Sequence, residues 1–351
     1  MVSTVATVLT QTTSAAPAGA GLQTSQVTLD AIAAVDSAST VAQLAIPMTA
    51  FFNQYGVEFH YDCTGIDTSY YGCAPATDLD FSEVKLASQW MIQEWSKYTA
   101  RLVNFTDLER VYIVGDVRVE ITGINQARAA VPDVQGKNMI YDHGYTNTEE
   151  YFRSVLHHEY AHYFEYGVYG QLNDTNRPDW IALNDPNFEY GDGGAVCYNG
   201  GCPTGEHVVE GFVTGYATSS AAEDFAETFA YMFTTTQYAR MNTWLADDSI
   251  LANKVAMLRE EILGVDSTAN AAYFTALHDY YNVTFAGGSI SLPAGEGTGT
   301  GSGTGGQAPG VPNTGARSTQ SVAGWIIALT ITIIAAAVAT VSVLVVRRKN
   351  N

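Results

Sequence analysis

Hydrophobic and polar positions along the chain predict a folded body over residues 30–286. Alternating apolar and polar residues, rich in β-branched and aromatic side chains, predict strands over 56–61 and 110–122. Residues 137–141 are predicted to form another short strand, and an amphipathic pattern over 81–103 predicts a helix. This mixture of strands and helices indicates an α+β fold.

A further helical pattern covers residues 148–166. Asn147 and Glu150 have the spacing of a capping box at its start, and Gly167 is expected to end it. This segment contains the first residues that indicate chemistry.

His158 and His162 are four residues apart, so their imidazoles project from one face of that helix, about one turn apart. Two nitrogens at this spacing can bind one Zn²⁺. Glu159 follows the first histidine and is placed to act as general base toward the attacking water. His157 is out of register with His162 and is no ligand candidate. The alternative is a chance pattern, with two ordinary histidines on a solvated helix face.

A catalytic zinc needs a third protein ligand. Glu165 and Val168 stand where the metzincin pattern has Gly and His, which excludes that class. Downstream, Glu223 and Glu227 lie one turn apart on a predicted amphipathic helix. One carboxylate can bind zinc while the other accepts the second N–H of a ligand histidine. The alternative is a solvated acidic face, which would account for Asp224.

The motif at 158–162 and the pattern Tyr-x6-Glu-x-Phe-Ala-Glu that begins at Tyr216 resemble the gluzincin metallopeptidases of the anthrax lethal factor and Pro-Pro endopeptidase type. The resemblance covers residues 110–240. It implies a zincin-like domain with a small mixed sheet, an active-site helix and a second ligand-bearing helix. It also implies that Glu223 is the third zinc ligand, Glu227 supports a ligand histidine, and Tyr216 helps to stabilise the oxyanion.

The expected function is hydrolysis of peptide bonds in peptide or protein substrates, with one catalytic Zn²⁺ and Glu159 as general base. The alternative is an anchored binding protein or adhesin on the same scaffold; the presence of base, ligands and oxyanion residue argues against it. Segment 167–215 is expected to form a loop region that lines the cleft. Within it, Trp180, Phe188 and Tyr190 are expected either to line a subsite or to pack locally.

The four cysteines form two short-range pairs, Cys63 with Cys73 and Cys197 with Cys202. Two local disulfides fit an exported protein. The alternative is one zinc site made by all four, but only the second pair has the usual spacing. The formal net charge of −20 argues against a nucleic-acid partner. It fits a solvated extracellular surface or, alternatively, selection of basic substrates.

The C-terminal part of the chain predicts an anchor. Residues 325–346 are an uninterrupted run without charge, long enough for one transmembrane helix. The basic tail at 347–351 is predicted to be cytoplasmic, which places the body on the extracellular face. Residues 287–324 are rich in Gly, Thr, Ser and Pro and predict a disordered stalk.

The stalk contains Val311, Pro312, Asn313, Thr314 and Gly315 ahead of the hydrophobic run and the basic tail. This order resembles a Gram-positive cell-wall sorting signal, with Val where that signal usually has Leu. The resemblance implies cleavage between Thr and Gly by a sortase and attachment to the cell wall. The alternatives are a chance match and simple membrane anchoring.

Residues 1–29 have some of the features of an export signal and lack others. Val2 to Leu9 are weakly apolar and Ala18 to Ala20 offer a cleavage site, but no basic residue precedes them. The prediction is an atypical or truncated signal followed by an N-terminal segment.

Overall fold

The computed structural model describes residues 25–121, 124–170, 177–194, 197 and 200–277. The predicted stalk, sorting motif, transmembrane run and basic tail lie outside these residues, as does most of the predicted export segment. Among the described residues, no helix has both the length and the apolar character needed to cross a bilayer.

The N-terminal half of the described chain combines helices with all of the strands. In chain order its elements are α1 (Gln26–Ser37), α2 (Val41–Asn53), β1 (Glu58–His60), β2 (Tyr71–Ala74), η1 (Asp78–Asp80), α3 (Phe81–Trp95), α4 (Ala100–Phe105), β3 (Arg110–Ile121), β4 (Ile124–Ala127), β5 (Ala130–Asp133), β6 (Asn138–Asp142) and η2 (His143–Tyr145). The remainder is helical: α5 (Glu149–Tyr169), α6 (Pro178–Ile181), η4 (Tyr216–Ser219), α7 (Ala221–Phe233), α8 (Thr235–Trp244) and α9 (Ser249–Val265).

A small mixed sheet has the strand order β1-β3-β6-β5, and β2 and β4 also pair with β3. β3 runs parallel to β1 and β6, whereas β5 pairs antiparallel with β6. Residues 110–114 of β3 pair with β1 and β6, and residues 115–121 pair with β2 and β4. Asp116, just after this change of partners, has a positive φ of 52°. The sequence prediction of an α+β body with a small mixed sheet is confirmed.

The two faces of the sheet belong to different hydrophobic clusters. Val111 and Ile113 of β3 join the large core with α2, α3 and α5. Tyr112 and Val114, which alternate with them, join a smaller cluster on the other face, beside the disulfide-linked Cys63 and Cys73. The second predicted disulfide, Cys197–Cys202, is also present.

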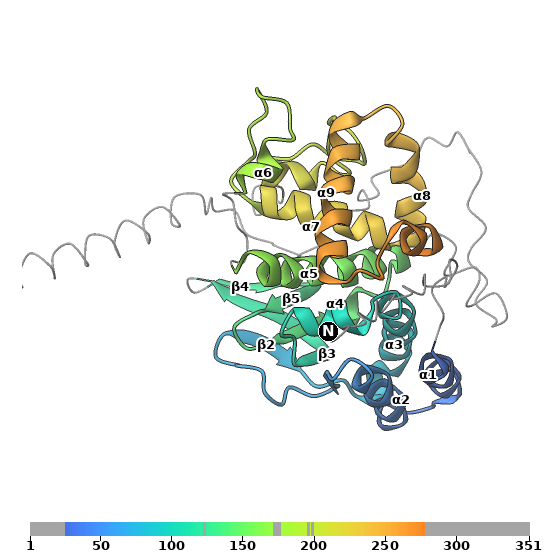
Figure 1. Cartoon of the computed structure of the whole chain (residues 1–351). Coiled ribbons are helices and arrows are strands. Elements are labelled where there is room, and N and C mark those ends of the chain that lie inside the picture. The colour runs from blue at the N-terminus through green and yellow to red at the C-terminus, as the bar shows by residue number, and fades with distance from the viewer. Residues whose placement is uncertain (1–24, 122–123, 171–176, 195–196, 198–199, 278–351) are drawn as a thin grey trace, which may run out of the picture.

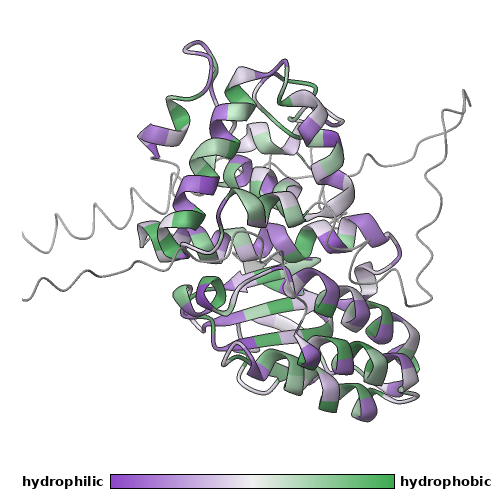
Figure 2. Cartoon of the chain, turned by 45° about the vertical axis from the view of Figure 1, so that its right-hand side comes forward, coloured by the Kyte–Doolittle hydropathy of each residue, from purple (hydrophilic) through white to green (hydrophobic). Residues whose placement is uncertain are grey.

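Helix α5 lies between the sheet and a helical layer that contains α7, α8 and α9 (Figure 1). Hydrophobic and hydrophilic positions alternate around many of these helices, as Figure 2 shows. α5 is buried along most of its length because elements cover it from both sides. A histidine on its α7-facing side is therefore held in the interior of the protein.

The predicted helix over 81–103 is wrong as one element, because the chain turns between α3 and α4. Ser96 donates its hydroxyl to the carbonyl of Gln93, which satisfies a free carbonyl at the end of α3. Thr99 then accepts the amide of Leu102 as the N-cap of α4. Two hydroxyl side chains thus end one helix and begin the next.

The predicted ends of the motif helix also need correction. Thr148 rather than Asn147 is the N-cap, and the Glu150 carboxylate binds Arg240 instead of closing a capping box. Gly170, at φ 71°, ends the helix. Gly167 lies inside the helix, and the close approach of Phe105 explains why it is glycine, because a Cβ there would lie 2.9 Å from the Phe105 ring.

Candidate metal centre

Packing of α5 against α7 brings the two predicted motifs together. The ring of Phe164 on α5 lies 6.5 Å from that of Phe225 and 5.8 Å from that of Phe229, both on α7. Tyr160 also contacts Phe229. These apolar contacts leave the histidine-bearing side of α5 facing the first turn of α7.

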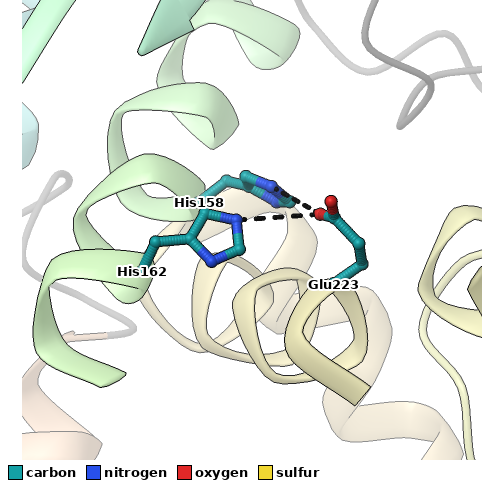
Figure 3. A group of neighbouring side chains, drawn as sticks. All are labelled: His158, His162 and Glu223. Carbon is teal, nitrogen blue, oxygen red and sulfur yellow. Dashed lines mark ion pairs between the residues drawn. The ribbon is translucent and has the colours of Figure 1, made fainter. Parts of the chain in front are cut away.

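His158 and His162 converge there on Glu223, whose amide is capped by Ser220 (Figure 3). Glu223 Oε2 lies 3.1 Å from His158 Nε2 and 3.7 Å from His162 Nε2. One ligand atom from each residue lies within 4.8 Å of the others, and both histidines are buried. Among the described residues, these three form the one group of this kind.

The donor set fits a zinc ion. Two imidazole nitrogens and one carboxylate oxygen are common ligands of catalytic zinc. Glu223 Oε2 is buried and makes no hydrogen bond to any described residue, although two imidazoles flank it. A buried oxygen without a hydrogen bond needs another partner, and a cation between the three side chains would be one. We therefore assign His158, His162 and Glu223 as the candidate site.

Each histidine also has a carboxylate behind it. His158 Nδ1 lies 2.9 Å from Glu227 Oε1, and Glu227 Oε2 accepts a hydrogen bond of 2.8 Å from the Thr214 hydroxyl. His162 Nδ1 lies 3.7 Å from Glu165 Oε2, and the Glu165 side chain is fully buried. A hydrogen-bonded carboxylate such as Glu227 orients a ligand imidazole and increases its basicity. The Glu165 carboxylate lies beyond hydrogen-bond distance of His162 Nδ1, and neither that nitrogen nor the Glu165 oxygens have a hydrogen-bond partner among the described residues.

Sequence reasoning placed Glu227 in this arrangement but missed Glu165 and Thr214. Glu165 could have been found, because a residue three positions after a ligand histidine lies on the same face of the helix. Thr214 precedes η4 and follows a long loop, so the sequence carries no comparable signal for it.

The carboxylates make the site favourable for a positive charge. Burial alone would lower the pKa of His158, but its contacts with Glu223 and Glu227 raise it well above the ordinary value. For His162, burial is likewise outweighed by Glu165 and Glu223, which raise its pKa to about 9. The carboxylates that raise these pKa values would also stabilise a metal cation bound between the histidines.

Glu159 and Tyr216 border the three residues. Glu159 is half-buried on α5, and burial raises its pKa above the ordinary value. The ring of Tyr216, at the start of η4, lies 6.1 Å from that of His158. His157 lies outside the group and contacts Glu94 and Tyr98 instead.

The aromatic residues of the intervening loop pack locally. Trp180 is fully buried with its ring 5.3 Å from that of Phe225, and Phe188 lies 4.5 Å from Phe212. The Tyr190 hydroxyl donates to Asp224. The packing interpretation therefore fits these three residues better than a subsite.

A solvated position for Asp224 is contradicted, because its side chain is fully buried and pairs with Lys254 at 2.7 Å. Trp180 Nε1 donates to the same oxygen. Asp224 is thus an internal ion-pair partner beside Glu223.

Comparisons with known proteins bear on the class of the chain. Residues 137–293 match the family model described as "Putative zinc-binding metallo-peptidase", and this segment includes both motifs. The prediction that the chain is a zinc metallopeptidase is confirmed by this match. A crystal structure of a "putative zinc-binding metallo-peptidase" from Bacteroides caccae ATCC 43185 is 16% identical, with a TM-score of 0.42, over 74% of this chain and 96% of that one. A comparison with curated proteins gave no match.

Proposed function

We propose that this chain is a zinc-dependent endopeptidase of the gluzincin type, with His158, His162 and Glu223 as the protein ligands. The observation that carries the proposal is the convergence of their three donor atoms within 4.8 Å in the buried interface of α5 and α7. The outer carboxylates Glu227 and Glu165 support it, because each faces the second nitrogen of one ligand histidine.

The surrounding side chains provide the remaining functions of peptide hydrolysis. When bound, zinc supplies Lewis-acid chemistry that activates water and polarises the scissile carbonyl. Glu159 takes a proton from the attacking water and donates it to the leaving amine. Tyr216 donates a hydrogen bond to the oxyanion.

Replacing the base while keeping the ligands tests this proposal. Glu159→Gln should bind zinc at the wild-type ratio but lose hydrolysis by a factor of at least about 10², the lower range for general acid–base catalysis. Exposed Glu189 offers a matched control, and Glu189→Gln should keep both zinc and activity. Zinc is measured by mass spectrometry of the metal, and cleavage by profiling a peptide library with and without chelator. Chelator-insensitive cleavage, or full activity of Glu159→Gln, would reject the assignment.

We also propose that the peptidase works on the extracellular face, anchored to the membrane or, after processing by a sortase, to the cell wall. The two disulfides support an oxidising compartment. Mass spectrometry of the mature C-terminus distinguishes the two anchors. An end at Thr314 joined to wall peptide indicates sortase processing, whereas an intact tail through residue 351 indicates membrane anchoring.

A further inference from the structure

A glycine-rich segment, residues 191–194, crosses the site beside Tyr216. Gly191 donates its amide to the carbonyl of Thr218 at 3.0 Å, and Gly193 donates to that of Ser219 at 2.8 Å. Both carbonyls belong to η4, the short helix that begins with Tyr216. The segment is therefore tied at two points to the element that carries the proposed oxyanion donor.

Gly194 lies against the functional groups themselves. A Cβ at this position would lie 2.2 Å from Tyr216 Oη, 2.8 Å from Tyr216 Cζ and 3.1 Å from Glu223 Oε1. The first two separations are shorter than non-bonded carbon contacts allow. Only glycine fits here while both side chains keep their places.

The restriction at Gly194 is spatial. Gly193, one residue earlier, shows the contrasting case: it has a φ of 91°, and a Cβ there would meet nothing within 4 Å. The glycine at 193 is required by backbone conformation, and the glycine at 194 by the approach of Tyr216 and Glu223.

We propose that Gly194 is a positioning residue for catalysis: its bare backbone packs against the Tyr216 hydroxyl and holds it beside Glu223. The inference rests on the proposed function. A methyl group at 194 has to move either the segment or the hydroxyl. The segment is held by its hydrogen bonds to η4 and is followed by the Cys197–Cys202 disulfide. The hydroxyl is the far end of one side chain, so it yields first.

A double-mutant cycle tests this coupling. Gly194→Ala should keep the wild-type zinc content and lower kcat to near the value of Tyr216→Phe, a loss of about 10²–10³ if the hydroxyl is an oxyanion donor. In the Tyr216→Phe background, Gly194→Ala should lower kcat no more than about threefold further, because the hydroxyl it displaces is already gone. Asp192→Ala is the matched control; Asp192 is exposed in the same segment, and its replacement should leave kcat unchanged.

Three results separate the possible failures. Wild-type kcat in Gly194→Ala, or losses that multiply in the double variant, would overturn the role of Gly194. Absence of cleavage by the wild type, judged against Glu159→Gln in the same assay, would instead reject the proposed function. If Gly194→Ala does not fold, Gly194→Ala/Tyr216→Ala should fold, because removal of the ring makes room for the methyl group. A double variant that also fails to fold contradicts the proposal.

Discussion

Replacing Asp224 should destabilise the protein strongly, although Asp224 is not one of the proposed metal ligands. Its Oδ2 atom accepts from Lys254 Nζ at 2.7 Å, from Trp180 Nε1 at 2.8 Å and from the Tyr190 hydroxyl at 2.7 Å. Asp224 and Lys254 are both fully buried. Asp224 therefore joins α7 to the loop before it and to α9.

The magnitude follows from what Asp224→Ala leaves behind. Removing one partner of a buried ion pair costs about 3–5 kcal/mol, because the other charge stays buried without compensation. Neutralising Lys254 at pH 7 offers no cheaper solution, since it costs about 4.6 kcal/mol from an ordinary lysine pKa of about 10.4. The loss of an acceptor for Trp180 and Tyr190 adds to this, at about 1–3 kcal/mol for each buried donor. We expect a total loss of at least about 3 kcal/mol.

Chemical unfolding followed by circular dichroism measures this loss, with chelator present so that zinc affinity does not contribute. Asp247→Ala removes an exposed aspartate near the start of α9 and should change the unfolding free energy by less than about 0.5 kcal/mol. Asp224→Asn/Lys254→Met removes both charges and should recover most of the stability lost by Asp224→Ala. A loss below about 1 kcal/mol for Asp224→Ala would refute the reasoning.

Two further predictions concern other buried carboxylates. Glu165→Ala should weaken zinc binding by about 10–100-fold, because it removes the carboxylate that faces His162. Glu165→Gln keeps an acceptor and should weaken zinc binding less. Competition with a chelator measures the zinc affinity of both variants, and a wild-type affinity in Glu165→Ala would contradict this role of Glu165. Burial alone would raise the pKa of Glu94, but Lys97 and Arg153 lower it below the ordinary value. The unfolded chain thus takes up this proton at higher pH than the folded chain, so the unfolding free energy should fall as the pH drops below about 4.3. Glu94→Gln should flatten that fall in acid unfolding curves, and an unchanged slope would exclude Glu94 as its source.

The metal centre could be predicted to the extent that helix geometry determines it. Residues four apart on a helix share a face whatever surrounds them, so the pairing of His158 with His162 followed from spacing alone. The approach of Glu223 depends on the packing of α5 on α7, and the resemblance of the second motif supplied that step.

The burial of individual charges could not be predicted in the same way. Asp224 looks like any acidic residue of an amphipathic helix, since its partners Lys254 and Trp180 are distant in sequence. Gly167 looks like a helix stop, but the close approach of Phe105 explains it. Gly194 must be glycine because Tyr216 packs against it. Tyr216 is distant in sequence, so the residues around Gly194 do not predict this contact.

The most direct test of the metal centre is an anomalous difference map collected at the zinc absorption edge from crystals of the purified protein. We predict one strong peak between His158 Nε2, His162 Nε2 and the Glu223 carboxylate, with the signal lost below the edge. No peak at that place in a zinc-replete, active protein, or a peak bound by other residues, would contradict the assignment of the site.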